Sequence, residues 1–215
     1  MNRELTAAID TLYDTFAAVP RPTGIDACPG CFGADDARDL LRPVPLRSLP
    51  ATALAHYAMH VGLTAGAADD FRHFLPRMLE VSVTDGFGGP EVGFVYPEVD
   101  AFVGRLRFTG WTTWDPAEQT AVREFLAAFW HDVLTTDPDW TFSADEVLCG
   151  IGNAEDDLTP YLATWAALLP ATHPAAHLRQ PLARQHVNAF WHGRAAQLAQ
   201  VAAWLAGPPT VGNAP

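Results

Sequence analysis

Two cysteines lie close together in a Cys-Pro-Gly-Cys segment, at Cys28 and Cys31. Two thiols separated by two residues can approach one metal ion, as they do in the turns of zinc knuckles. His56 and His60 follow along the chain four residues apart, so in a helix both imidazoles lie on one face. Together these four side chains would complete a tetrahedral zinc site.

The same residues also allow a different ligand set and a different chemistry. His73 or Cys149 could replace one of the two histidines as a ligand. The thiol pair could instead cycle through a disulfide, but reactive pairs usually follow a strand and open a helix, and Asp35 and Asp36 would oppose a thiolate. The ordinary interpretation is that unmodified thiols pack a turn against the first helix and that one histidine is half-buried with a backbone partner.

Aromatic residues supply a second candidate site. The chain has seven tryptophans, and Trp111 and Trp114 come directly before a helix start. A tryptophan pair in a loop can line a groove or anchor a partner, and it can equally fold back over a core. We predict Trp111 and Trp114 as partner-binding residues.

Composition and charge exclude several classes of function. The 215 residues are 49% hydrophobic, carry a net charge of -12 and contain thirteen arginines without any lysine. The arginines are scattered, whereas nucleic-acid binding needs a cationic face, so we expect no nucleic acid as a partner. The sequence contains no long apolar run and only three cysteines, which predicts no contact with a membrane and a cytoplasmic location.

Apolar residues recur with the period of amphipathic helices and not with that of strands. The sequence therefore predicts an all-α fold of about eight or nine helices, as a compact bundle or a short irregular solenoid. We expect residues 1–207 to form a single helical domain, followed by a flexible C-terminal tail at 208–215. Residues 82–97, rich in glycine, predict a long surface loop.

Helix starts and stops can be placed from capping residues. Asp115-Pro116 and Ser143 are strong start signals, and Ser48 predicts the N-cap of a helix that carries both histidines to about Val61. Pro76 predicts a kink, or two short helices that meet at Leu75. The other expected helices cover residues 3–19, 34–41, 69 onward, 99 to near Gly110, 159–169 and 181–207.

The chain resembles an uncharacterised group of bacterial, mostly helical proteins. The resemblance is carried by Cys28 and Cys31 and by Phe-Leu-Pro-Arg at residues 74–77, with Trp114 and Glu118 as later echoes. It covers mainly the first eighty residues and implies an all-helical fold without an established activity.

No catalytic set is complete in the sequence, since it contains neither a Gly-x-Ser-x-Gly elbow nor a phosphate-binding loop. Our leading hypothesis is a non-catalytic cytoplasmic domain that binds a protein or peptide in a groove between helices, next to the loop at 82–97. The alternative is a zinc-binding protein or metal-dependent enzyme that uses Cys28, Cys31, His56 and His60.

Overall fold

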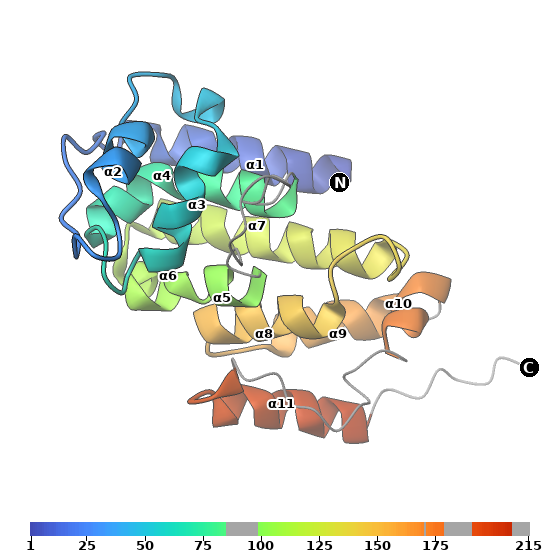
Figure 1. Cartoon of the computed structure of the whole chain (residues 1–215). Helices are drawn as coiled ribbons and strands as arrows, with labels where there is room; N and C mark the ends of the chain where they lie inside the picture. Colours follow the sequence, from blue (N-terminus) through green and yellow to red (C-terminus); the bar gives the residue numbers. More distant parts are fainter. Residues whose placement is uncertain (85–98, 170, 179–190, 208–215) are drawn as a thin grey trace, which may run out of the picture. The chain divides into compact units, whose positions relative to one another are not determined.

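A computed structural model of the chain describes residues 1–84, 99–169, 171–178 and 191–207 (Figure 1). These described residues form eleven α-helices and three 3-10 helices, and their extended pairing is limited to two isolated bridges. The all-α prediction is confirmed. The number of α-helices exceeds the expected eight or nine because short helices such as α5, α6 and α10 are counted separately. Among these helices, none is long and apolar enough to cross a lipid bilayer.

The α-helices are α1 (Arg3–Thr15), α2 (Ala34–Leu40), α3 (Ala51–His60), α4 (Ala68–Val83), α5 (Val99–Val103), α6 (Arg105–Phe108), α7 (Pro116–Thr135), α8 (Ala144–Ala154), α9 (Thr159–Leu168), α10 (Thr172–His177) and α11 (Ala195–Ala206). The 3-10 helices are η1 (Phe16–Ala18), η2 (Leu46–Ser48) and η3 (Trp111–Thr113).

The helices group into two compact units. Unit 1 consists of Met1–Glu98 and Arg105–Phe125, and unit 2 of Val99–Gly104 and Leu126–Pro215. The boundary after Phe125 falls inside α7, so this helix contributes to both units. The single domain at 1–207 stays a prediction. The predicted tail, and the predicted loop from residue 85 onward, lie outside the described residues.

The core of unit 1 forms where α1 packs along α4. The predicted stripe of α1 is confirmed, since Leu5, Ile9 and Leu12 are all buried. Asn2 caps this helix by accepting the backbone N–H of Leu5 on its side-chain oxygen at 2.8 Å. Burial of one apolar face explains why this segment is helical.

Helix α4 runs unbroken through Pro76, so the predicted alternative of two short helices is wrong. Phe71 and Phe74 before the proline are fully buried, and so are Met78 and Leu79 after it. The same core therefore holds both halves of the helix in line, and this packing outweighs the backbone hydrogen bond that an internal proline removes.

Three other predicted boundaries need correction. Helix α3 begins at Ala51 behind Pro50, because Ser48 belongs to η2 and does not act as the N-cap. The helix expected from Val99 to near Gly110 is divided at Gly104 into α5 and α6. Of the terminal helix expected over 181–207, residues 181–190 lie outside the described residues, residues 191–194 form a turn in which Gly193 has a positive φ of 78°, and α11 begins at Ala195.

Tryptophan side chains form the core of unit 2. Trp130 and Trp165 are fully buried and meet edge to face, with ring centroids 5.3 Å apart. Each indole N–H finds a backbone carbonyl, that of Tyr161 for Trp130 and that of Pro174 for Trp165. Buried tryptophans need such partners, so these contacts fix α7 against α9 and α10.

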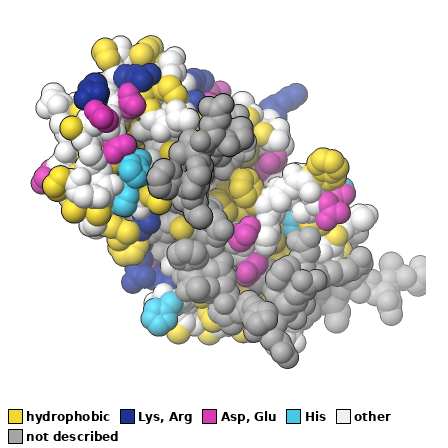
Figure 2. Space-filling view, viewed as in Figure 1, with side chains coloured by type: hydrophobic (Ala, Val, Ile, Leu, Met, Phe, Trp, Pro, Cys, Tyr) yellow, Lys and Arg dark blue, Asp and Glu magenta, His cyan; other side chains and the backbone are white. Residues whose placement is uncertain are grey.

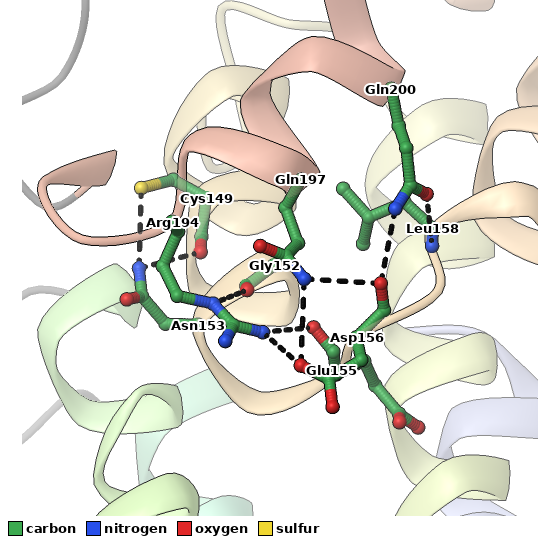
Figure 3. A network of polar contacts seen from close by, with 9 residues as sticks. All are labelled: Cys149, Gly152, Asn153, Glu155, Asp156, Leu158, Arg194, Gln197 and Gln200. Atoms are coloured by element: carbon green, nitrogen blue, oxygen red, sulfur yellow. Dashed lines mark hydrogen bonds and ion pairs between the residues drawn. The ribbon is translucent and has the colours of Figure 1, made fainter.

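A buried arginine joins the end of α8 to the start of α11 in unit 2 (Figure 3). The Arg194 guanidinium donates to the carbonyl oxygens of Gly152 and Glu155 at 2.7 and 2.6 Å, and to the Asp156 carboxylate at 2.8 Å. Gln197 and Gln200 of α11 both donate to the Asp156 carbonyl. This network satisfies the carbonyl groups at the C-terminal end of α8.

Gly152 allows Trp191 to pack directly against α8. A methyl group at Gly152 would lie 2.5 Å from the Trp191 ring, closer than carbon atoms approach one another. We expect Gly152→Ala to lower the free energy of unfolding by about 1–3 kcal/mol, measured by urea denaturation. Gly207→Ala is the control, because its methyl would meet only Ala203 O at 3.9 Å. Equal stability of both variants would contradict the close contact.

Candidate functional site

The cysteine segment is held in place by a second loop, which follows α3. Cys28 N–H donates to Thr64 O at 2.9 Å, and Gly66 N–H donates to Asp26 O at 2.8 Å. These bonds make an antiparallel bridge between Ala27 and Ala65. Two irregular loops of unit 1 thereby fix each other at the end of α3.

The pairing of the two loops requires glycine at position 66, because the Tyr57 side chain leaves no room there for a larger residue. Its φ of 71° is in the left-handed region that favours glycine, and a methyl group there would lie 2.5 Å from the Tyr57 hydroxyl oxygen. Tyr57 itself is fully buried on α3. The loop can close over α3 only while residue 66 lacks a side chain.

Cys28 to Phe32 form a tight turn. The Cys28 carbonyl accepts the N–H groups of Cys31 at 2.9 Å and Phe32 at 3.0 Å. Phe32 is buried, and its ring meets the Tyr57 ring edge to face at 5.9 Å. Phe32 therefore anchors the turn to α3, and the cysteines lie on a connecting loop, as the sequence predicts.

The two thiols of the turn differ in exposure and in electrostatic surroundings. Cys28 is exposed and Cys31 half-buried. Hydrogen bonds from the Gly30 backbone N–H, and then from the side chain and backbone of Cys31, lower the pKa of the Cys28 thiol. A lowered pKa raises the fraction of Cys28 that is present as thiolate, which is the nucleophilic form of cysteine.

Asp36, which we expected to oppose a thiolate, is occupied by other groups. Burial disfavours its charge, but the Gly33 N–H at 2.8 Å and His56 outweigh burial and lower the pKa of the carboxyl group. His56 Nδ1 lies 3.0 Å from Asp36 Oδ1. This carboxylate therefore caps α2 and pairs with the histidine.

His56 and His60 share one face of α3, as predicted, with ring centroids 5.2 Å apart. His60 Nδ1 lies 3.2 Å from the Thr64 hydroxyl group. Burial, and then electrostatic interactions with His56 and Arg105, lower the pKa of His60. Figure 2 shows histidine side chains beside acidic ones on the face over α2 and α3.

The predicted zinc ligands do not form a metal-binding group. Within the described residues, which include Cys28, Cys31, His56 and His60, no three His, Cys, Asp or Glu side chains are placed to hold a metal ion. His73 contacts Val19 O at 3.1 Å, and Cys149 is buried in unit 2, where the Asn153 amide lies 3.6 Å from its sulfur. The zinc site stays a prediction of the sequence.

A hollow of about 370 Å³ opens beside the cysteine turn, and we name it the cysteine pocket. Its lining combines small residues with Leu63 and Phe108, which are 56% and 59% exposed. The residues that line the cysteine pocket are Asp26, Ala27, Cys28, Gly62, Leu63, Thr64, Ala65, Gly66, Ala67, Ala68, Phe108 and Thr109. Cys28 thus lies at a depression that presents both polar groups and two exposed apolar side chains.

The predicted tryptophan pair lies elsewhere in unit 1. Trp111 is 1% exposed, with the Arg123 guanidinium 4.9 Å above its ring, so this side chain belongs to the core and its position does not support a partner-binding role. Trp114 is half-buried against Phe16 and Phe71. Its partner-binding role stays a prediction.

A second hollow of about 500 Å³ lies near Trp114. The loop after α1 and the start of α4 line it, together with Glu118. Arg72 donates to both carboxylate oxygens of Glu118, at 2.6 and 3.2 Å, and to Asp69 at 2.8 Å. Arg72 is thus engaged by two carboxylates of the lining, which carries acidic and basic groups of similar number and gives no preference for a ligand of one charge.

Sequence reasoning missed Leu63 and Phe108. The only signal for them was position, because Leu63 follows the end of α3 and Phe108 lies off the apolar stripe of its segment. It also missed Trp140, which is 85% exposed in unit 2.

Comparison with known proteins returned no match from protein-family models, curated proteins or solved structures. The resemblance to a bacterial group therefore stays an expectation, and the function has to be argued from the site itself.

The backbone N–H of Gly30 can be removed to test its effect on Cys28. We expect Gly30→Pro to shift the pH midpoint of Cys28 alkylation upward, because proline has no N–H to stabilise the thiolate. Gly30→Ala keeps the donor and meets Cys28 Sγ at an ordinary 4.0 Å, so its midpoint should match that of the natural protein. Iodoacetamide labelling followed by peptide mass spectrometry measures both midpoints, and identical values would refute the role of this N–H.

The Tyr57 hydroxyl group is buried and has no hydrogen-bond partner among the residues that the structure describes. Tyr57→Phe should therefore leave the free energy of unfolding unchanged or raise it by up to about 1 kcal/mol, because it removes an unsatisfied polar group. Tyr13→Phe is the contrasting variant, since the Tyr13 hydroxyl donates to Glu80 at 2.6 Å, and it should cost about 1 kcal/mol. Urea denaturation distinguishes the two, and a similar loss in both would show that Tyr57 has a partner.

Proposed function

We propose that this chain is a polypeptide-binding protein, and that unit 1 binds an apolar segment of a partner at the cysteine pocket. The observation that carries the proposal is that Leu63 and Phe108, two large apolar residues, are both exposed and both line the cysteine pocket. Large apolar side chains that are exposed together at a depression are typical of interaction sites.

The dimensions and lining of the cysteine pocket favour a peptide side chain as its occupant. A hollow of about 370 Å³ is at the small end of ligand sites and accommodates one or two apolar side chains. Ala65, Ala67 and Ala68 leave this space open because their side chains are short. Asp26 is the charged residue of the lining, which argues against phosphate groups and hence against nucleic acid.

The proposal keeps the partner class expected from the sequence but moves the site. The predicted groove beside residues 82–97 is replaced by the depression between the loop at Cys28 and the loop after α3. We place the protein in the cytoplasm, which is supported by the odd number of cysteines.

Binding can be tested with peptides selected from a random library displayed on phage. Selection should use the Cys28→Ser variant, so that covalent capture plays no part. We expect the selected peptides to carry large apolar side chains, and Leu63→Asp or Phe108→Asp to weaken their binding at least about tenfold, measured by fluorescence anisotropy.

Trp140→Asp serves as the matched control, since it changes another exposed apolar side chain, one that belongs to unit 2. It should leave binding unchanged. Binding that survives both pocket variants, or a library that yields no binder, would refute the proposed site.

A further inference from the structure

The two cysteines of the turn differ in their exposure to solvent. Cys28 is exposed and lines the cysteine pocket, whereas Cys31 is half-buried and is not part of the lining. The Cys31 side chain is within hydrogen-bonding reach of the Cys28 thiol. A polypeptide bound in the pocket can therefore reach the Cys28 thiol, and the Cys31 thiol can reach Cys28.

We propose that Cys28 and Cys31 form a redox dithiol that reduces a disulfide in a polypeptide bound at the cysteine pocket. Cys28 is the attacking thiol and Cys31 is the resolving thiol. The inference rests on the proposed function for its substrate, and it adds a reaction to binding.

The reaction balances within the two partners. The Cys28 thiolate attacks one sulfur of the partner's disulfide, a Cys28–partner disulfide forms, and the other partner sulfur leaves as a thiolate that takes up a proton. Cys31 then loses its proton and attacks the Cys28 sulfur, which forms the Cys28–Cys31 disulfide and releases the second partner thiol. Two electrons pass from the dithiol to the partner, and a cellular dithiol reductant restores the starting state.

The local structure supports the first step. Backbone and side-chain N–H and S–H groups stabilise the Cys28 thiolate, so its nucleophilic form is populated more than in an unfolded chain. The opposing charge of Asp36 is engaged by His56 and by the N-terminus of α2. Asp35 pairs with Arg38. These contacts remove the objection that acidic neighbours would suppress the thiolate.

The surroundings also favour a polypeptide over a small anionic disulfide. Leu63, Phe108 and Asp26 line the same pocket as Cys28. The two exposed apolar side chains suit an uncharged peptide segment, and the Asp26 carboxylate disfavours oxidised glutathione, which carries several carboxylates. The chain's net charge of -12 acts in the same direction.

A synthetic apolar peptide closed by an internal disulfide serves as the test substrate, with oxidised glutathione as the second probe. With the natural protein, we expect stoichiometric reduction of the peptide and formation of a Cys28–Cys31 disulfide, located by peptide mass spectrometry. Cys31→Ser should stop at a mixed disulfide between Cys28 and the peptide. Cys28→Ser should lose the reaction, and glutathione should react more slowly than the peptide.

Controls within the same protein separate reactivity from unfolding. Cys149 is fully buried, so it should remain unlabelled throughout. A circular dichroism spectrum of each variant checks the helical fold. Phe108→Asp should slow the reaction with the peptide, because it alters docking and not the thiols, and Trp140→Asp in unit 2 should leave that reaction unchanged.

The outcomes distinguish this inference from the proposed function. If Cys28→Ser binds the reduced peptide but the natural protein transfers no electrons to the disulfide form, the dithiol reaction is wrong and the binding site stands. If glutathione oxidises the pair but no apolar peptide binds, the polypeptide substrate is wrong along with the proposed function. Purified protein that holds one zinc ion on these thiols and resists oxidation would also overturn the inference.

Discussion

The close approach of Gly66 to Tyr57 is the constraint on which the candidate site depends. Because residue 66 has no side chain and a positive φ, the loop after α3 closes onto the helix and presents its backbone to residues 26–28. The turn that follows is pinned by Phe32 against the same tyrosine. The buried Tyr57 ring thus contacts both loops beside the cysteine pocket, while its hydroxyl group has no hydrogen-bond partner among the described residues.

The same principle operates in unit 2 with different residues. Gly152 lets Trp191 approach α8, and the nearby Arg194 guanidinium binds the carbonyl groups where that helix ends. In both units, a glycine allows an aromatic ring to come close, and polar groups then fix the loop beside it. Such contacts specify one packing arrangement, whereas apolar burial alone tolerates several.

Local signals predicted much of the fold. The starts of α7 and α8 follow from Asp115 and Ser143, whose side chains accept backbone N–H groups of the first helical turn. Pro76 was misjudged because its cost is local, while the burial on both sides that offsets it arises only in the folded core. For the site, the sequence placed the cysteines on a loop and both histidines on one face, but it could not show that Asp36 holds His56 or that Phe108 is exposed.

The order of the two units along the chain has a consequence for synthesis on the ribosome. Val99–Gly104 belongs to unit 2, and unit 1 is completed only by Arg105–Phe125. The N-terminal unit therefore cannot finish folding when residue 98 emerges, and it must wait for a segment that follows part of the other unit. The apolar core of unit 1 therefore stays incomplete for longer during translation than the core of a domain made from one continuous segment.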